Sequence, residues 1–498
     1  MKYHIVHLGC QMNQSDAERI QAVIEAMGYE ETAQEEDAEI LGIVACSVRQ
    51  KAIDKVYSKI HQWNSWKQKR NILTFVSGCI LPTDREKFLD RFDLLFGIHE
   101  LPQLPEMIAQ YGITTPFSGG QFGGGLELIR DSETPRLTLP ARIGPQAQHE
   151  QQTRRAHSLQ PARIGLSVQR GLSALSRPSM QEFWNIRPHY RSPFEAFIPI
   201  QNGCDKFCTF CAVPYTRGRE VSRPSSEIIE EVQNLIDRNY RSITLLGQNV
   251  NSYGQDGGGR EMNFPELMRK IGEIGREMGR EDDFRVYFTS PHPRDMTREL
   301  LEVIAEHSCL AKQIHLPLQS GDDKLLIKMN RNHSMQRYRD IVSNIRAILP
   351  SATLFTDIIV GFTGETEEQF ENTRLAMEEF QYNMAYIAMY SPRPGAASSR
   401  WADDVPQNEK KRRLRVLSDI LHKTSGAYNR ELLGKTLRVL VEGRDRTGTY
   451  LAGRTEGKLP LRFVSAADAP IGHFVNLRIS SARGLSLEGE LIEEAVNV

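Results

Sequence analysis

The stretch FEAFIPIQNGCDKFCTFCAVP, residues 194–214, contains an apolar run of strand length followed at once by three cysteines. Cys204, Cys208 and Cys211 have the spacing C-x3-C-x2-C, and thiolates this close together can ligate one soft metal centre. A structural zinc site or a four-cysteine cluster needs a fourth ligand, and no Cys or His lies near enough in sequence. The stretch therefore predicts an iron–sulfur cluster held by three cysteines. Three thiolates on a cubane leave one iron without a protein ligand, and that iron can bind a small chelating ligand. The alternative is three buried thiols in one loop.

Around this stretch, strand-like and helical segments alternate from residue 194 to residue 425. Helical segments such as Ser226–Asp237 and Met335–Ile348 separate six strand-like runs. The runs are Phe194–Ile200, Ser242–Leu246, Phe284–Thr289, Gln313–Leu318, Leu354–Val360 and Met384–Met389. Six β/α units favour a partial or full parallel barrel, in which the chemistry lies at the carboxyl ends of the strands. We therefore expect an α/β fold with a central domain over residues 192–428.

The first 112 residues show the same alternation and form a predicted N-terminal domain, 1–112. A capping-box pattern at Ser15–Glu18 predicts a helix start, and Gly28 predicts its end. Three short apolar runs predict parallel strands, namely Tyr3–Leu8, Glu39–Ala45 and Asn71–Ser77.

Each of these three runs is followed by a cysteine: Cys10, Cys46 and Cys79. The carboxyl ends of parallel strands lie side by side, so three thiols distant in sequence should converge at one edge of the sheet. This placement predicts a second three-cysteine metal site, although any one of these cysteines alone would be read as a small buried hydrophobic residue. The seventh cysteine, Cys309, is predicted to be structural.

Two further segments differ in composition. Residues 113–191 contain a glycine-rich run, no lysine or cysteine, and the pentapeptide PARIG twice, at 140–144 and 161–165. We expect a flexible insertion or linker, with an RNA-contacting arm as the alternative. Residues 431–495 carry short strand signals punctuated by glycine (Leu437–Glu442, Tyr450–Gly453 and Phe474–Ile479), which predicts a small all-β domain. From Lys435 to Arg478 this segment contains eight basic and four acidic residues, so that part is net positive.

Composition excludes several classes of protein. The chain has 498 residues with 62 Lys and Arg against 63 Asp and Glu, which excludes a polybasic nucleic-acid binder but not a local basic face. Seven cysteines are too few, and odd in number, for an extracellular disulfide framework. Neither a membrane-spanning apolar run nor a signal peptide is recognisable, so a cytoplasmic protein without membrane contact is expected.

Longer motifs resemble a known family. They are GCQMNQSD (9–16), CSVRQKA (46–52), CTFCAVPYTRGREVSRP (208–224), LLGQNVNSYG (245–254), HLPLQSGDDKLLIKMNR (315–331) and TDIIVGFTGET (356–366). In this order they resemble the methylthiotransferases of the radical S-adenosylmethionine superfamily. The string CAVPYTRGRE is most similar to the members that modify isopentenyladenosine in tRNA. The resemblance covers residues 1–112 and 194–495.

The resemblance implies a central radical-SAM partial (βα)6 barrel and a C-terminal TRAM-like RNA-binding barrel. It also implies two [4Fe-4S] clusters and S-adenosyl-L-methionine as cofactors. The cluster on Cys204, Cys208 and Cys211 would cleave S-adenosylmethionine, and an auxiliary cluster on Cys10, Cys46 and Cys79 would donate the sulfur. The substrate would be C2 of N6-isopentenyladenosine beside the tRNA anticodon, with a flavodoxin-type reductase as electron donor. We also expect a monomer.

Polar and basic residues at the strand ends complete the predicted site. The candidates for cofactor binding are Gln248, Asn249, Ser290, His292, Gln319, Ser320 and Asp357, each of which could instead be a turn or cap residue. The candidates for RNA binding are Arg217, Arg219, Arg223, Lys435, Arg454 and Lys458, for which a solvated basic face is the alternative. The basic run 410–415 is expected to be a solvated helix face.

The sequence departs from the family in two places and leaves alternative functions open. Val44-Ala45 replaces the usual Asn-Thr before Cys46, and Thr363 replaces the usual proline after Phe362. The alternatives are a methylthiotransferase acting on threonylcarbamoyladenosine in tRNA or on an aspartate of a ribosomal protein, and a metal-stabilised RNA-binding protein without catalysis. The CAVPYTRGRE string and the basic C-terminal domain favour the isopentenyladenosine enzyme.

Overall fold

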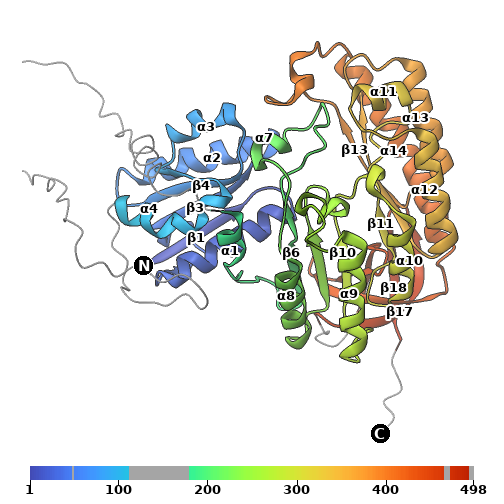
Figure 1. Ribbon diagram of the computed structural model, residues 1–498, viewed down its shortest axis with the longest axis horizontal. Coiled ribbons are helices and arrows are strands. Elements are labelled where there is room, and N and C mark those ends of the chain that lie inside the picture. Colours follow the sequence, from blue (N-terminus) through green and yellow to red (C-terminus); the bar gives the residue numbers. More distant parts are fainter. Residues whose placement is uncertain (48–49, 112–178, 465–470, 493–498) are drawn as a thin grey trace, which may run out of the picture.

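The computed structural model describes residues 1–47, 50–111, 179–464 and 471–492. Figure 1 shows an N-terminal α/β domain in blue at the left, a central barrel in green to orange, and a small red β-barrel at the lower right. The predicted fold class, an α/β protein with a partial barrel and an all-β C-terminal domain, is confirmed. No helix in these residues has the length and apolar character needed to cross a membrane.

The N-terminal domain is a five-stranded parallel sheet in the order β2-β1-β3-β4-β5. Its strands are β1 Lys2–His7, β2 Glu30–Glu31, β3 Ile40–Cys46, β4 Leu73–Cys79 and β5 Leu94–Leu95. Its helices are α1 Gln11–Ala26, α2 Gln50–Trp66, α3 Pro82–Leu89 and α4 Leu104–Tyr111. The central strand β3 is buried along its whole length because an apolar cluster covers each face of the sheet.

The predicted start of the first helix is wrong by one turn. Helix α1 begins at Gln11 with Cys10 as its N-cap, so Ser15 lies inside the helix. Ser15 is buried against the barrel, where its hydroxyl donates to the carbonyl of Phe197 (3.1 Å) and accepts from Arg19 (2.9 Å). The serine of the apparent capping box therefore serves a tertiary contact that the local pattern does not reveal.

The stretch predicted as a linker is structured at its C-terminal end. Residues 112–178 lie outside the described part of the chain, including both copies of the PARIG repeat. From residue 179 onward the chain forms α6 (Met180–Trp184), whose Phe183 and Trp184 are buried in the apolar cluster of the N-terminal sheet. Burial of two aromatic side chains accounts for the order of this segment.

The central domain is an arc of six parallel strands in sequence order. Two three-stranded sheets, β6-β9-β10 and β11-β12-β13, are joined by a single bridge between Val286 and Leu310. The strands are β6 Glu195–Pro199, β9 Ser242–Leu246, β10 Arg285–Phe288, β11 Gln313–His315, β12 Thr353–Val360 and β13 Met384–Met389. The outer helices are α8 Ser225–Asp237, α9 Phe264–Glu277, α10 Arg298–Glu306, α12 Met335–Ile348, α13 Glu367–Phe380 and α14 Gln407–Arg430. The prediction of six β/α units is confirmed.

The cysteine loop has a support that the sequence analysis did not detect. Two short antiparallel strands, β7 (Gln201–Asn202) and β8 (Val221–Ser222), pair at its base. The loop that they close contains all three cysteines and the short helix α7 (Val213–Arg217). A second short helix, α11 (Asp323–Lys328), precedes residues that contact the loop.

The C-terminal domain is a closed five-stranded barrel in the order β14-β15-β16-β18-β17. Its strands are β14 Thr436–Arg444, β15 Leu451–Thr455, β16 Pro460–Phe463, β17 Phe474–Arg483 and β18 Ser486–Leu491. The turn between β15 and β16 docks at the amino ends of the central strands, where Thr353 donates to the Gly457 carbonyl (2.8 Å) and Glu456 accepts from the Lys312 amide (3.0 Å). This turn therefore packs against the amino ends of β11 and β12.

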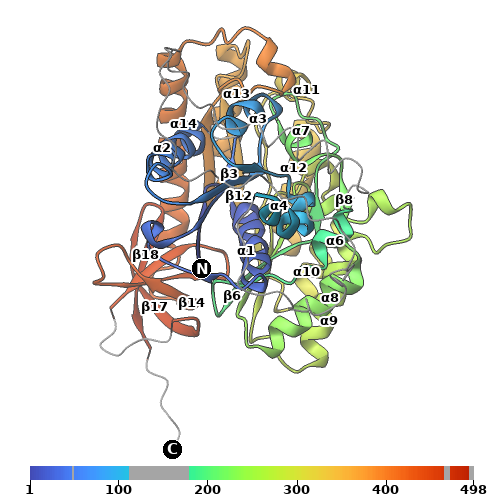
Figure 2. The ribbon, with the colours of Figure 1, turned by 90° about the vertical axis from the view of Figure 1, so that its left-hand side faces the viewer.

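The N-terminal domain covers the barrel at β6. Figure 2 shows α1 lying beside β6, and an apolar cluster of Met12, Phe197 and Leu246 joins the two domains. The carboxyl edge of the N-terminal sheet thereby faces the carboxyl end of the barrel, since α1 starts at that edge.

Candidate functional site

Cys10, Cys46 and Cys79 lie together at the carboxyl edge of the N-terminal sheet. Cys46 and Cys79 end β3 and β4 and pair in register, and Cys10 follows β1, the neighbour of β3 on its other side. All three border one cavity. The structure thus brings the three cysteines together as the strand pattern predicts, and their role as iron ligands stays a prediction.

Glycine is required immediately before the third of these cysteines. Gly78 has a φ of +102°, and a Cβ at this position would lie 2.5 Å from the carbonyl oxygen of Ala45. A side chain here would therefore displace β4 from β3 and move Cys79 out of register.

The departure at Val44-Ala45 falls in the apolar core. Both side chains are fully buried, one on each face of the sheet. The Ala45 backbone carbonyl accepts a hydrogen bond from Asn13 Nδ2 (2.9 Å), while Asn13 Oδ1 lies 3.4 Å from Cys10 Sγ. Asn13 therefore links the backbone of β3 to the thiol of Cys10 without a side chain from residue 45.

A guanidinium from the central domain contacts Cys79. Arg217, the last residue of α7, donates from Nε to Cys79 Sγ at 3.0 Å. Burial raises the pKa of the Cys79 thiol to about 12, and the positive charge of Arg217 opposes that rise. An N–H group directed at sulfur suits a thiolate, the form in which cysteine binds metal.

The loop that carries Cys204, Cys208 and Cys211 has similar surroundings. Burial raises the pKa of Cys204 to about 11 and that of Cys211 to about 12. The Val213 amide donates to Cys211 Sγ (3.5 Å), and Arg331 donates to Cys208 Sγ (3.4 Å). Each of the two cysteine sets thus has one buried guanidinium at one of its sulfur atoms.

The residues that follow α11 form hydrogen bonds with this loop. Asn330 donates to the carbonyls of Lys206 (3.2 Å) and Phe207 (3.0 Å), and the Thr209 amide donates to the Met329 carbonyl (3.0 Å). The motif that ends in Lys328-Met329-Asn330-Arg331 therefore holds the cysteine loop. Sequence reasoning identified the motif but missed this role of Asn330 and Arg331.

The two cysteine sets fit iron–sulfur clusters. Within the described residues, no three His, Cys, Asp or Glu side chains are arranged to hold a single metal ion. A cubane binds each thiolate through a separate iron, so its ligands need not converge on one point. Both sets offer soft sulfur donors and an N–H group directed at sulfur, and a cavity adjoins Cys10, Cys46 and Cys79.

Residues of all three domains line one cavity of about 750 Å³. It is lined by Cys10, Cys46 and Cys79, by Gln248, Ser290 and Asp357, and by Arg454 and Lys458 of the C-terminal barrel. Asp357 pairs with His315 (2.9 Å), and the half-exposed ring of Tyr386 stands beside that histidine. A planar nucleobase could be held between this aromatic surface and the polar strand ends.

The other predicted cofactor-binding residues lie in local networks. Asn249 Nδ2 donates to Ser252 (2.7 Å) and to Asp295 (3.1 Å). His292 caps the turn that follows β10, and burial lowers the pKa of its imidazole, which is therefore neutral. Gln319 pairs through its backbone with β12, and Ser320 accepts from the Asp322 amide. Ser320 thus has a turn role, the alternative given for it, while cofactor binding by Gln319 stays a prediction.

Several buried polar atoms in this region have no partner within the described residues. They are Glu220 Oε2, Asn249 Oδ1, His292 Nε2 and Arg331 Nε. Burial raises the pKa of Glu220 to about 7, even though Ser252 donates a hydrogen bond to it. Unsatisfied buried groups are costly, so their concentration beside the Cys204–Cys211 loop suits a polar ligand with both charges, such as an amino acid.

Two of the predicted RNA contacts are corrected by the structure. Arg217 is enclosed between Cys79 and Asp16, and Arg223 forms ion pairs with Glu227 and Glu231 on α8. Acidic side chains on α1 and α8 enclose both guanidinium groups. The two arginines are therefore buried and unavailable to RNA. Arg219 and Lys435 are exposed, and their contact with RNA stays a prediction.

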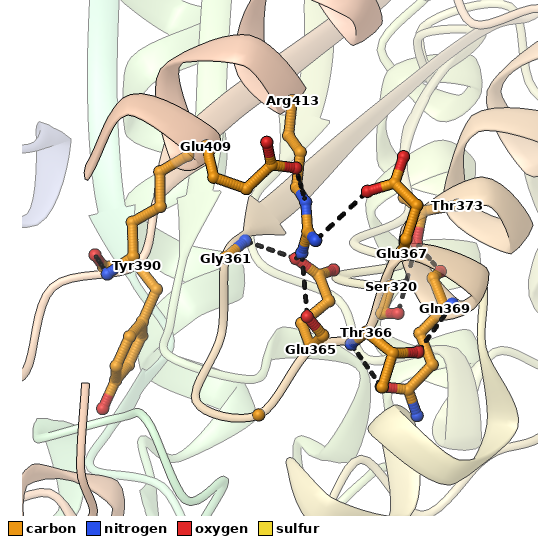
Figure 3. A network of polar contacts seen from close by, with 12 residues as sticks. Ser320, Gly361, Glu365, Thr366, Glu367, Gln369, Thr373, Tyr390, Glu409 and Arg413 are labelled. Atoms are coloured by element: carbon orange, nitrogen blue, oxygen red, sulfur yellow. Dashed lines mark hydrogen bonds and ion pairs between the residues drawn. The ribbon is translucent and has the colours of Figure 1, made fainter. Parts of the chain in front are cut away.

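The basic run 410–415 is not a purely solvated face. Figure 3 shows Arg413 reaching from α14 to the carboxylate of Glu365. Arg413 donates to that carboxylate (2.7 Å) and to the Glu365 carbonyl (3.0 Å), and Glu365 also accepts from the Gly361 amide (2.5 Å). Lys410 is buried and donates to the Tyr390 carbonyl (3.0 Å). These residues anchor the loop between β12 and α13, whose apolar residue Phe362 contacts Phe210 of the cysteine loop.

The seventh cysteine is structural in its surroundings. Cys309 is fully buried in the main apolar cluster of the barrel, and burial raises the pKa of its thiol to about 12. It lies outside the cavity lined by Cys10, Cys46 and Cys79.

Similarity to known proteins covers the whole chain. Residues 198–376 match the radical SAM superfamily, residues 2–97 match the uncharacterized protein family UPF0004, and residues 430–492 match the TRAM domain. A tRNA-2-methylthio-N(6)-dimethylallyladenosine synthase from Oceanobacillus iheyensis is 35% identical over 100% of this chain and 85% of its own length. Proteins of the same name from Bacillus subtilis (32% identical; 100% and 87% covered) and Cronobacter sakazakii (33%; 99% and 92%) are also similar. Among solved structures, the cobalamin-dependent radical enzyme OxsB matches with a TM-score of 0.45 at 12% identity, over 83% of this chain and 56% of that one.

Proposed function

The chain belongs to the MiaB family of radical S-adenosylmethionine tRNA methylthiotransferases, and on that premise we propose how its residues divide the work. The protein is an enzyme that uses S-adenosylmethionine and a [4Fe-4S] cluster. Its reaction adds a methylthio group to C2 of N6-isopentenyladenosine, also called dimethylallyladenosine, in tRNA. The shared name of relatives that cover the full chain favours this substrate over threonylcarbamoyladenosine or a ribosomal protein.

We propose that Cys204, Cys208 and Cys211 hold the cluster that binds S-adenosylmethionine. When bound, this cluster supplies the electron that cleaves the cofactor to a 5′-deoxyadenosyl radical, which an unactivated C–H bond requires. Arg331 and Asn330 orient the cysteine loop, and the unpartnered atoms of Glu220, Asn249 and His292 offer contacts to the polar groups of the cofactor. The surrounding burial excludes water from these contacts.

We propose that Cys10, Cys46 and Cys79 hold the auxiliary cluster. This cluster would supply the sulfur atom that is inserted. The single observation that supports the proposal most strongly is the shared cavity, because the same space is bordered by these three cysteines and by barrel residues such as Gln248 and Ser290. A nucleoside in the cavity would contact these three cysteines and the barrel residues at once, which would hold it beside the sulfur-donating cluster.

The domain limits and partners follow the family assignment. We propose a methylthiotransferase domain over 1–112, a radical-SAM barrel over 192–428 and a TRAM-like domain over 431–495, with 113–191 as an insertion. The two strand-end cations of the last domain, Arg454 and Lys458, would contact the tRNA backbone at the cavity. A flavodoxin-type electron donor, a monomeric state and a cytoplasmic location remain proposals of the same kind.

Anaerobic reconstitution tests the assignment of two clusters. The full chain should bind about eight iron atoms, four for each cluster, and should form 5′-deoxyadenosine when S-adenosylmethionine and a reductant are added. About four iron atoms would reject the auxiliary cluster. Bound zinc in place of iron, or no cofactor cleavage, would favour a metal-stabilised RNA-binding protein instead.

Lys458 predicts a pH dependence of tRNA binding. Burial, followed by the charge of Arg454, lowers the pKa of Lys458 to about 8, and its ammonium group lies 4.1 Å from the ring centre of Tyr287. Lys458 is charged below pH 8 and neutral above it, so affinity for tRNA should fall between pH 7 and pH 9 at constant salt. Lys458→Ala should weaken binding about tenfold at pH 7 and reduce the salt dependence by about one phosphate contact.

Filter binding or fluorescence anisotropy at several salt concentrations would measure these effects. Lys458→Arg is the matched control, because arginine keeps its charge over this range and should remove the pH dependence while retaining the affinity. An unchanged pH profile in Lys458→Ala would show that another group causes it.

A further inference from the structure

Arg217 occupies a buried position between the two cysteine sets. It ends α7, six residues after Cys211, and its side chain is only 3% exposed. In Figure 1, α7 lies against the N-terminal domain and not among the barrel helices. Arg217 therefore connects the loop of Cys204, Cys208 and Cys211 to Cys79 of the other cysteine set.

Each edge of the Arg217 guanidinium has a partner. Nε donates to Cys79 Sγ at 3.0 Å, the two terminal nitrogens face the carboxylate of Asp16 on α1, and one of them also donates to Asn202 Oδ1 at 3.2 Å. Asn202 in turn donates to the Arg217 carbonyl at 3.0 Å. Residues of three other elements, β4, α1 and β7, thus fix the guanidinium that α7 carries.

This arrangement has a direct electrostatic consequence for a cluster bound through Cys79. Reduction adds negative charge to a cluster, so a buried cation at its ligand stabilises the reduced form and raises the reduction potential. The Asp16 carboxylate, 1% exposed, offsets part of that cation, because burial limits screening by water. The potential should therefore depend on the balance between the two charges.

We propose that Arg217 is a positioning residue that fixes the Cys79 ligand of the auxiliary cluster and, together with Asp16, sets the reduction potential of that cluster. The inference rests on the proposed auxiliary cluster. It assigns to Arg217 a role in the reaction centre in place of the predicted contact with RNA. Through its place in the chain, Arg217 also fixes the auxiliary ligands relative to the Cys204–Cys211 loop.

Removing either charge should shift the reduction potential of the auxiliary cluster, and the two shifts should have opposite signs. Arg217→Met removes the cation and should shift the one-electron reduction equilibrium at least tenfold toward the oxidised cluster, which is about 59 mV to more negative potential. Asp16→Asn removes the offsetting anion and should shift the potential to more positive values. Arg217→Lys retains the charge and should restore most of the Arg217→Met shift. A residue that only stabilised the fold would not produce shifts of opposite sign.

The measurement is a redox titration followed by electron paramagnetic resonance. The parent is the full chain carrying Cys204→Ala, Cys208→Ala and Cys211→Ala, so that only the auxiliary cluster is observed. Arg219→Met is the matched control from the same loop, since Arg219 is exposed, pairs with Asp205 and is not hydrogen-bonded to Cys79; it should leave the potential unchanged.

The outcomes separate this inference from the proposed function. An iron-free parent would overturn the auxiliary cluster and the inference with it. A loaded parent whose potential is unmoved by Arg217→Met and Asp16→Asn, or moved in the same direction by both, would overturn the inference alone. If Arg217→Met takes up no iron, the sign of the Asp16→Asn shift decides.

Discussion

Cys46→Ala is expected to lower formation of the methylthio product by more than about 100-fold while 5′-deoxyadenosine formation continues. Cys46 borders the cavity with the auxiliary set, whereas Cys204, Cys208 and Cys211 lie in a separate loop held by Arg331 and Asn330. Removing the Cys46 thiol therefore leaves the surroundings of Cys204, Cys208 and Cys211 intact. Both products can be quantified by liquid chromatography and mass spectrometry in one reaction.

Cys309→Ala is the matched control for this substitution. Cys309 is also buried but packs in the barrel core, so its replacement should lower stability. It should not lower the methylthio product while 5′-deoxyadenosine formation continues. Loss of 5′-deoxyadenosine in Cys46→Ala would contradict the division of labour between the two cysteine sets.

Arg413→Met is expected to give the largest loss of stability, about 3–5 kcal/mol, because it leaves a buried carboxylate without its cation. The side chains of Arg413 and Glu365 are 5% and 0% exposed, and Glu365 has no other cationic partner within the described residues. The loop that they anchor contacts the cysteine loop through Phe362 and Phe210. Activity should therefore fall together with stability.

Arg412→Met is the control, since Arg412 precedes Arg413 and pairs with Glu367 and Glu409 at the surface. Its loss should cost less than about 1 kcal/mol because water screens exposed ion pairs. Thermal unfolding and hydrogen exchange of residues 361–366 would measure both variants. Equal effects in the two would mean that burial of the Arg413–Glu365 pair contributes nothing.

Features that follow from local pattern were predictable from the sequence. The six barrel strands and the convergence of Cys10, Cys46 and Cys79 were predicted because strand-length apolar runs and parallel topology place strand ends together. Ser242–Leu246 and Met384–Met389 agree with the structure to the residue. The short strands β16 and β18 were missed, since glycine-punctuated runs of this length carry little periodic signal.

Features that depend on partners distant in sequence were not predictable. Arg217 and Arg223 were assigned to RNA, yet Asp16, Glu227 and Glu231 bury them. In the same way, Arg413 belongs to the basic run 410–415, which was predicted to be solvated, but it forms a buried ion pair with Glu365. A charged residue in a loop shows its type in the sequence but not its partner. Arg454 and Lys458 line the cavity where it extends to the C-terminal barrel, and their contact with RNA stays a prediction.

The product nucleoside tests the proposed reaction most directly. Isopentenylated tRNA should be incubated anaerobically with the reconstituted chain, S-adenosylmethionine and a reductant, and then digested to nucleosides for mass spectrometry. We predict 2-methylthio-N6-isopentenyladenosine, absent from reactions with Cys46→Ala or Cys208→Ala. Formation of 5′-deoxyadenosine without that nucleoside, or methylthiolation of threonylcarbamoyladenosine instead, would contradict the assigned substrate.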